Sequence, residues 1–352
     1  MRDTNRSDRS GSLDGALRQV RFEKLMRVSV DVNVDQLIEG ELGRWLADQS
    51  GMRRAAKEQA KSRWIWSGGL TACVLVYAWF VSGWGMPIIL FLTLTLSIAA
   101  GAWGYMPIAN ASEAIKVGIN SAIARSFGLS YTAQVEPGAE FKLARTYGLL
   151  PQYTRRHTED RWFGALEGHD FSLYEAHLEV RRGSGKNKRW ETVFQGAVLD
   201  VEFGRSFGST TLLQRAGTHR KWFGLGGSKD HVSFGGHRLD LVDQVHPAFE
   251  DAFGVYSDDQ VEARVLVHPS YIEHLIALER AFRGDQLRAL FHKGSVIIAV
   301  ESERLFESGS VDESGDRERV REAAEQFTAL AKLAIAINQT ERGRSLDTRA
   351  TG

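Results

Sequence analysis

The sequence predicts an α+β protein in two parts: a helical hairpin that crosses a membrane, and a cytoplasmic domain built on an antiparallel sheet. Residues 64–106 contain no Asp, Glu, Lys, Arg or His, although 25% of the chain is charged. Beyond about residue 129, alternating apolar and polar residues predict several strands, with amphipathic helices beside them. These two observations set the fold class.

The uncharged stretch is about twice the roughly 20 residues that a helix needs to cross a bilayer. Residues 82–87 (SGWGMP) interrupt it, and their two glycines and proline end one helix and begin the next. We therefore predict two spans, at about 64–82 and 87–106. Trp64, Trp84 and Trp103 lie at successive span ends, as expected of aromatic residues at water interfaces. The late position and the length of the stretch are wrong for a signal peptide.

Basic residues surround the hairpin but are absent from its tip, which predicts that both flanks and both termini are cytoplasmic in a bacterial inner (plasma) membrane. The basic residues that precede and follow the spans are Arg53, Arg54, Lys57, Lys61, Arg63, Lys116 and Arg125. Without ionisable groups inside the spans, the hairpin lacks the means for a proton relay or ion pathway, so we expect no transporter.

Small residues recur four apart on the second span, at Ser97 and Gly101 and at Ala100 and Gly104. Such residues let another helix approach closely. We expect the first span to pack there, while a protein partner or a second copy of the chain remains the alternative.

The flanks of the hairpin are predicted to form a helical stalk over 16–63 and a second stalk helix over 111–128. Residues 1–15 are polar and expected to be disordered, and 28–34 alternate as in a short strand. Asp35 is a plausible N-cap of one long helix that continues into the first span. After the second span, Ile115, Ile119 and Ile123 recur four apart up to a stop at Gly128.

Residues 129–339 are expected to form the cytoplasmic α+β domain, followed by a disordered tail over 340–352. Strand patterns at 171–180 and 191–203 flank a polar turn, RRGSGKNKR, and predict an antiparallel hairpin. Further strands are predicted at 210–214, 237–242 and 296–300, and a helix at 269–282 that begins with a proline. The last helix has an apolar stripe made of Val320, Ala324, Phe327, Leu330, Ala331, Ala334 and Ile335.

Five pieces of this domain resemble a bacterial family of membrane-anchored proteins, the domain of unknown function numbered 3137. The pieces are LLPQY at 149–153, EDRWFG at 159–164, FSLYEAHLE at 171–179, VFQGAVLDVEF at 193–203 and FEDAFGVYSDDQVEARVLVHPSY at 249–271. The last piece is the most specific. The resemblance covers most of the chain from about residue 115 onward, least well at 204–236, and implies a two-span hairpin followed by a cytoplasmic α+β domain. It implies no activity, ligand or catalytic residue, because the family has none established.

Two sets of residues are weak candidates for chemistry. Asp258, Asp259 and Glu250 could gather carboxylates for a divalent cation or for acid–base work, as in a cation-dependent hydrolase. The alternative is a turn in which an Asp side chain bonds the backbone. His268 and His274 lie six apart, a spacing that fits zinc poorly, and we expect ordinary histidines with no metal.

The remaining composition narrows the function further. Cys73 is the single cysteine, so no intramolecular disulfide or cysteine zinc cluster can form. The formal net charge of +0 gives no overall basic field, which argues against nucleic acid as a partner. With no nucleophile, base and metal constellation and no cofactor motif, we expect a membrane-anchored binding or interaction module rather than an enzyme. The alternatives are the hydrolase above and an accessory subunit of a larger membrane complex.

Overall fold

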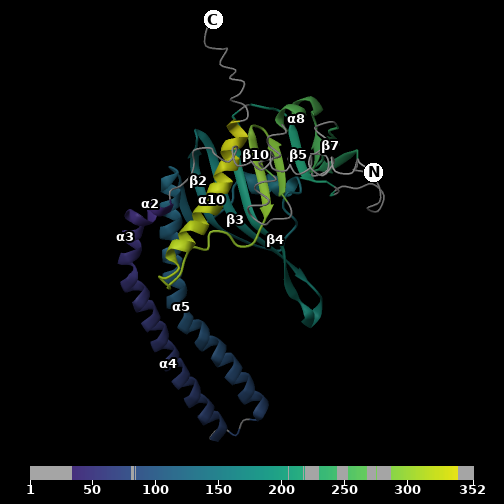
Figure 1. Cartoon of the computed structure of the whole chain (residues 1–352). Coiled ribbons are helices and arrows are strands. Elements are labelled where there is room, and N and C mark those ends of the chain that lie inside the picture. Colours follow the sequence, from purple (N-terminus) through teal and green to yellow (C-terminus); the bar gives the residue numbers. More distant parts are fainter. Residues whose placement is uncertain are drawn as a thin grey trace, which may run out of the picture. The chain divides into compact units, whose positions relative to one another are not determined.

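The computed structural model describes residues 34–80, 83, 85–204, 206–216, 218, 230–243, 253–267, 275 and 287–339 (Figure 1). The chain divides into two compact units. Within the described residues, the helical unit comprises 34–123 and 306–324, and the sheet unit comprises 124–305 and 325–339.

Three helices stand where the sequence predicts one long helix from Asp35 into the first span. They are α2 (Val34–Glu39), α3 (Glu41–Asp48) and α4 (Ser50–Phe80). The break between α2 and α3 depends on close backbone approach: a Cβ on Gly43 would lie 1.7 Å from the carbonyl oxygen of Ile38. A glycine is therefore required inside α3, and the helical periodicity of the side chains does not reveal this turn.

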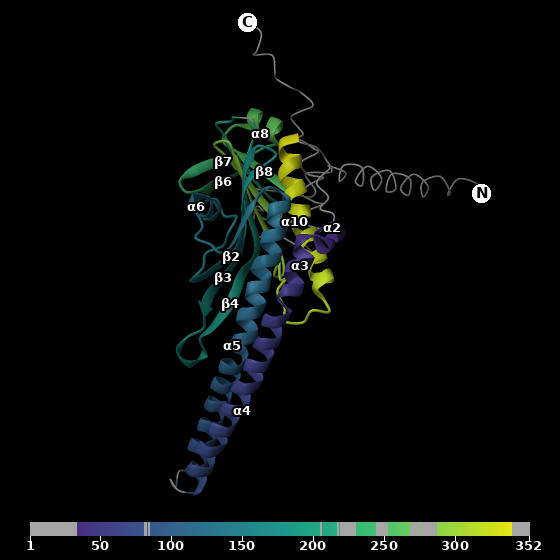
Figure 2. The ribbon, with the colours of Figure 1, turned by 90° about the vertical axis from the view of Figure 1, so that its left-hand side faces the viewer.

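The helix α5 (Met86–Ser126) runs antiparallel to α4, and Figures 1 and 2 both show the two side by side. The indole N–H of Trp64 donates to the carbonyl oxygen of Gly101 at 3.4 Å, and a Cβ on Gly104 would lie 1.9 Å from the Trp64 ring. Gly104 therefore lies against the first helix, as predicted. The break predicted at 82–87 is confirmed, since α4 ends at Phe80 and α5 begins at Met86.

The second stalk helix is the continuation of α5 rather than a separate helix, because α5 passes through Pro107 without a break. Ile115, Ile119 and Ile123 are fully buried, so the predicted apolar stripe is confirmed. The chain leaves the helix just before Gly128, whose φ of 71° suits a glycine at a helix end.

In the sheet unit, ten described strands form one antiparallel sheet in the order β1-β2-β3-β4-β10-β9-β5-β8-β7-β6. The strands are β1 (Ser130–Gln134), β2 (Arg155–Leu166), β3 (His169–Arg182), β4 (Arg189–Glu202), β5 (Thr210–Arg215), β6 (His231–Phe234), β7 (His237–Leu241), β8 (Phe253–Ser257), β9 (Leu287–His292) and β10 (Ser295–Glu301). The predicted strands at 171–180, 191–203, 210–214, 237–242 and 296–300 are confirmed, including the β3–β4 hairpin.

Helices cover both faces of this sheet. On one face, Tyr174 and Leu178 of β3 share a buried cluster with Phe141 and Ala144 of α6 (Ala139–Thr146). On the other face, Phe327 of α10 (Asp316–Gln339) packs on Trp162 and Phe171, with ring centroids 4.4 and 6.1 Å apart. Figure 2 shows α6 and α10 on opposite sides of the sheet. The apolar stripe predicted for the last helix is buried along its whole length.

Two short elements complete the described fold, α8 (Gln260–Leu266) and a single 3-10 turn, η1 (Gly185–Asn187). The predicted strand at 28–34 and both terminal tails lie outside the described residues, apart from Val34, which begins α2. The predicted helix at 269–282 also lies outside them, except for Leu275.

Candidate functional site

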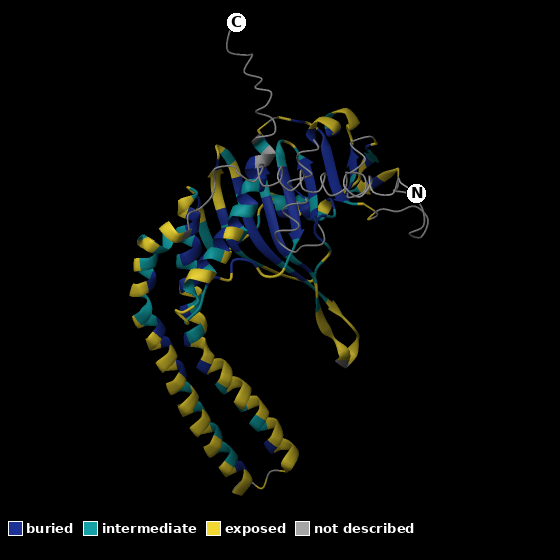
Figure 3. Ribbon diagram, in the orientation of Figure 1, coloured by how far each residue is buried: buried dark blue, intermediate teal, exposed yellow. Residues whose placement is uncertain are grey.

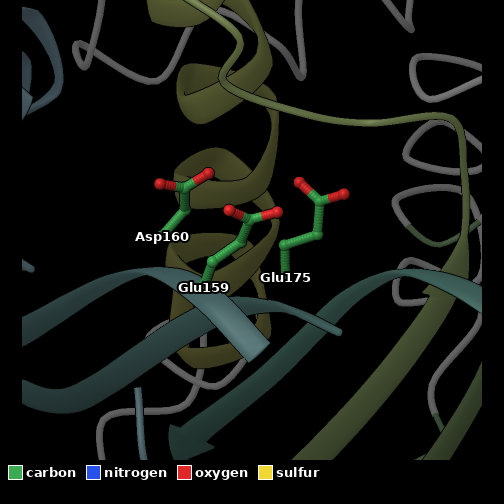
Figure 4. Close-up of side chains that lie close together, drawn as sticks. All are labelled: Glu159, Asp160 and Glu175. Atoms are coloured by element: carbon green, nitrogen blue, oxygen red, sulfur yellow. The ribbon is translucent and has the colours of Figure 1, made fainter. Parts of the chain in front are cut away.

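Three carboxylates lie together on the paired strands β2 and β3: Glu159, Asp160 and Glu175 (Figure 4). Glu159 and Glu175 face each other across the two strands, and Asp160 follows at a β-bulge where its φ is 58°. One oxygen of each carboxylate lies within 4.8 Å of the others. The bulge turns Asp160 inward, so this cluster depends on the strand register rather than on neighbouring positions in the sequence.

Protein groups already bind two members of this acidic cluster. The hydroxyl of Tyr131 donates to Oδ1 of Asp160 at 2.5 Å, and the backbone N–H of Leu305 donates to Oε2 of Glu175 at 3.0 Å. Both carboxylates are buried. A set of oxygen ligands suits a hard divalent cation such as Mg²⁺ or Ca²⁺. The same hydrogen bonds also explain the cluster as a structural link between the sheet and the segment that follows β10.

The predicted carboxylate pair sits at the corner between β8 and α8. Oδ1 of Asp259 accepts the backbone N–H groups of Val261 and Glu262 at 2.9 and 3.0 Å, so Asp259 is the N-cap of α8. Oδ1 of Asp258 accepts the backbone N–H of Thr210 at 2.8 Å. The two carboxylates thus bind different backbone groups, as in the turn interpretation. Glu250, His268 and His274 lie outside the described residues.

A histidine that the sequence does not single out lies beside this corner. The hydroxyl of Thr210 is 3.1 Å from Nδ1 of His292, on the neighbouring strand β9. Burial and the charge of Lys293 lower the pKa of His292, while Asp258 acts in the opposite direction. A neutral imidazole beside a hydroxyl can exchange a proton with it. Thr210 is itself buried, so substrate access to this pair is restricted.

Asp200, near the end of β4, is a described carboxyl whose pKa is raised, to about 6. Burial is the main cause, and the negative charge of Glu140 adds to it, while Arg161 acts in the opposite direction. Glu140 also accepts a hydrogen bond from the Tyr174 hydroxyl at 3.2 Å, and burial raises the pKa of that tyrosine. Alternation alone marks Asp200 as a polar strand position and does not indicate this buried environment.

Most residues at the far end of the α4–α5 hairpin are exposed (Figure 3), and many of them are large and hydrophobic. Of the large hydrophobic side chains described as exposed, all but Phe163, Trp190, Val261 and Val265 lie between Trp64 and Met106. Among the described residues one helix, α5, is long and apolar enough to cross a membrane by length and composition, and none of its apolar segment is buried. The first predicted span, 64–82, runs two residues beyond the described end of α4.

Comparison with known proteins gives a match to one family model over part of the chain. The model of a family described as "Protein of unknown function (DUF3137)" matches residues 192–339, from β4 to the end of α10. The pieces at 149–153, 159–164 and 171–179 that carry part of the resemblance precede this match. No curated protein matches the chain.

Among solved structures, the crystal structure of the mycobacterial trehalose monomycolate transport factor A, TtfA, is similar, with a TM-score of 0.29 and 11% identity over 62% of this chain and 95% of that one. Similarity at that level supports no conclusion about function. The matched residues include 249–271, the most specific piece of the sequence resemblance. Residues 192–339, less than half of the chain, are similar to the DUF3137 family of proteins of unknown function.

Proposed function

We propose that this protein is an interaction module held at the cytoplasmic face of a bacterial inner membrane by a two-span hairpin, α4 and α5. The observation that carries the proposal is the concentration of exposed apolar side chains on that hairpin, from Trp64 to Met106. Water-soluble proteins rarely expose contiguous apolar patches larger than a few hundred Å². A bilayer is the environment in which such a surface is stable.

Exposed side chains on α4 support a second span beside α5. Ile65, Leu70 and Phe80 are all more than half exposed, and they continue on α4 the apolar surface of α5. One ionised residue at the bilayer centre would offset several of these side chains, and α4 has none after Arg63. The basic residues before α4 and after the apolar part of α5 support cytoplasmic termini.

The sheet unit supports binding better than catalysis. The carboxylates of Asp258 and Asp259 accept backbone N–H groups, which supports a structural role for each. The helical hairpin supports anchoring rather than transport, since residues 64–106 include no Asp, Glu, Lys, Arg or His that could form an ion pathway. An accessory subunit of a membrane complex is a special case of the same proposal, and Gly101, which has open space beside it, offers a contact point.

Labelling of the single cysteine tests the anchor directly. Cys73 lies on α4 within the predicted first span and is exposed in the isolated chain. In membrane vesicles, a membrane-impermeant maleimide should leave Cys73 unlabelled until detergent is added. Labelling without detergent would place α4 in water and contradict the two-span anchor.

Two variants made in a Cys73→Ser background establish orientation. Ala165→Cys lies on an exposed position of β2 and should react in inverted vesicles but not in intact cells. Gly85→Cys lies at the hairpin tip, where a Cβ would meet only the Pro87 side chain at 3.7 Å, and should show the reverse pattern. Reaction of both from the same side would refute the proposed topology.

Purification from native membranes in mild detergent then separates the functional alternatives. Bound proteins and metal content should be measured in the same sample. A stoichiometric partner is the expected result. Stoichiometric metal without a partner would instead favour the cation-dependent hydrolase.

A further inference from the structure

The β3–β4 hairpin extends beyond the strands on either side of it. Pairing of β2 with β3 reaches Arg155 opposite Glu179, and pairing of β10 with β4 reaches Glu301 opposite Gly196. Beyond these positions the hairpin continues alone, and Figure 1 shows it projecting from the sheet. We call residues 181–190 (RRGSGKNKRW) at its end the basic loop.

Positive charge is concentrated in the basic loop. Its ten residues include five basic and no acidic side chains, although the whole chain has a formal net charge of +0. The strand register places Arg182 opposite Arg189, an arrangement that is destabilising for like charges. The pair between Arg182 and Glu191, at 3.1 Å, offsets part of this charge and is itself largely exposed. The loop therefore carries more positive charge than this ion pair offsets.

An aromatic ring stands beside these cations. Trp190 is 44% exposed, and the guanidinium of Arg155 lies 4.5 Å from its ring centroid. Nε of Arg155 donates to Oε2 of Glu179 at 2.6 Å, which fixes the guanidinium over the ring. Indole rings with neighbouring cations are typical of protein surfaces that contact the headgroup region of a bilayer.

We infer that the basic loop binds anionic phospholipid headgroups at the membrane surface. The inference rests on the proposed anchor, because a bilayer that holds α5 also tethers the sheet unit. Residues 107–126 of α5 and the linker 127–129 join the proposed second span to β1, and such a covalent tether raises the effective concentration of the loop at the membrane. A nucleic acid or an acidic protein would use the same charges, and bases can also stack on an indole, but neither partner gains from the anchor.

The test uses the full chain with a reporter cysteine in the loop, Ser184→Cys in a Cys73→Ser background. The protein is reconstituted in vesicles of phosphatidylcholine, or of equal parts phosphatidylcholine and phosphatidylglycerol, with the sheet unit outside. The rate of reaction with a polar maleimide is then measured. At about fivefold in affinity for each basic residue near an anionic surface, the reaction should slow at least fivefold in the anionic vesicles. High salt should restore the rate, since exposed charges are screened.

Matched variants separate the loop from the rest of the surface. Neutralising Lys186, Lys188 and Arg189 to Gln should abolish the protection. Neutralising three basic residues elsewhere on the sheet unit, Lys142, Lys293 and Arg304, should leave it intact. A reporter at Ala165, near the opposite end of β2, should react equally in both vesicles.

Flotation of the same samples distinguishes failure of the anchor from failure of the loop. A protein that floats with both vesicles but shows equal reaction rates keeps its anchor and overturns the inference. A protein that floats only with anionic vesicles, and loses this in the loop variant, supports the inference and refutes the anchor. Protection by added RNA but not by anionic lipid would assign the loop to nucleic acid and overturn the inference.

Discussion

Replacing Asp316 with alanine should destabilise the helical unit more than replacing its partner Arg53. Arg53 of α4 is fully buried, and its Nη1 and Nη2 donate to the two oxygens of Asp316 at 2.7 and 3.1 Å. Asp316, the first residue of α10, also accepts from Nη2 of Arg319 at 2.7 Å. The Asp316 carboxylate therefore joins the start of α10 to α4 through the Arg53 guanidinium, and it is also bound by Arg319 of its own helix.

The asymmetry follows from which charge remains buried. In Asp316→Ala, the Arg53 guanidinium stays in the interior without its carboxylate, and removal of one partner of a buried pair costs about 3–5 kcal/mol. In Arg53→Met, Asp316 keeps Arg319 and is partly exposed, and the methionine fills much of the vacated space. The expected loss is then about 1–2 kcal/mol, since the remaining charge stays paired and near water. Arg53→Met combined with Asp316→Leu should recover part of the loss, because hydrophobic replacement of a buried pair is often neutral.

Thermal unfolding of the full chain in detergent, together with hydrogen exchange at the first turns of α10, measures these differences. The matched control is Glu318→Ala, which removes the exposed pair with Arg321 on the same helix and should cost no more than about 0.5 kcal/mol. If Asp316→Ala lowered stability no more than Glu318→Ala, or less than Arg53→Met, the buried pair would have no special role and the argument would fail.

Three further changes test other parts of the structure. Gly118→Ala should destabilise the helical unit because the new Cβ would lie 2.0 Å from the ring of Trp45. Adding Trp45→Leu to the same chain should relieve the clash. Thermal unfolding of the single and the double variant tests this expectation. The pKa of Asp200 is raised to about 6 in the folded chain, so its contribution to stability is present below its ordinary value of 3.8 and is lost as the pH rises through about 6. Asp200→Asn should therefore raise the free energy of unfolding at pH 7 by about 1–3 kcal/mol. The denaturation midpoint of this variant should depend less on pH between pH 4 and 6 than that of the unmodified protein. An unchanged pH dependence would contradict this assignment. Asp259→Ala should lower the free energy of unfolding by about 1 kcal/mol, because α8 loses its N-cap, while Asp259→Asn should lower it little. Urea unfolding measures both. An equal loss in the two variants would indicate a role for the charge itself.

Local sequence patterns were sufficient where one element's own side chains decide its structure. The uncharged stretch and its Gly-Pro break predict the α4–α5 hairpin, since two long apolar segments without charges and a turn between them are visible in consecutive residues. The same holds for β3, β4 and α10, whose alternation or apolar stripe matches the faces that the structure buries.

Sequence patterns did not predict strands that form mainly through hydrogen bonds to neighbouring strands. Residues 155–161 (RRHTEDR) are continuously polar and resemble a loop, yet they form half of β2. That strand exists because β1 and β3 bond both of its edges, and the bulge at Asp160 lets charged side chains face inward. β1, β8 and β9 are also strands that no clear alternation predicts, because tertiary pairing overrides weak local preference.

The candidate sites divide in the same way. The sequence alone determined where the chain is apolar, where it is basic and that Asp258 and Asp259 adjoin a turn, because these are properties of consecutive residues. Only the tertiary structure brought Glu175 beside Glu159 and Asp160, His292 beside Thr210, and Arg53 beside Asp316. Each of these groupings joins residues from separate strands or helices, and strand register and helix packing, which depend on the whole chain, decide which side chains meet.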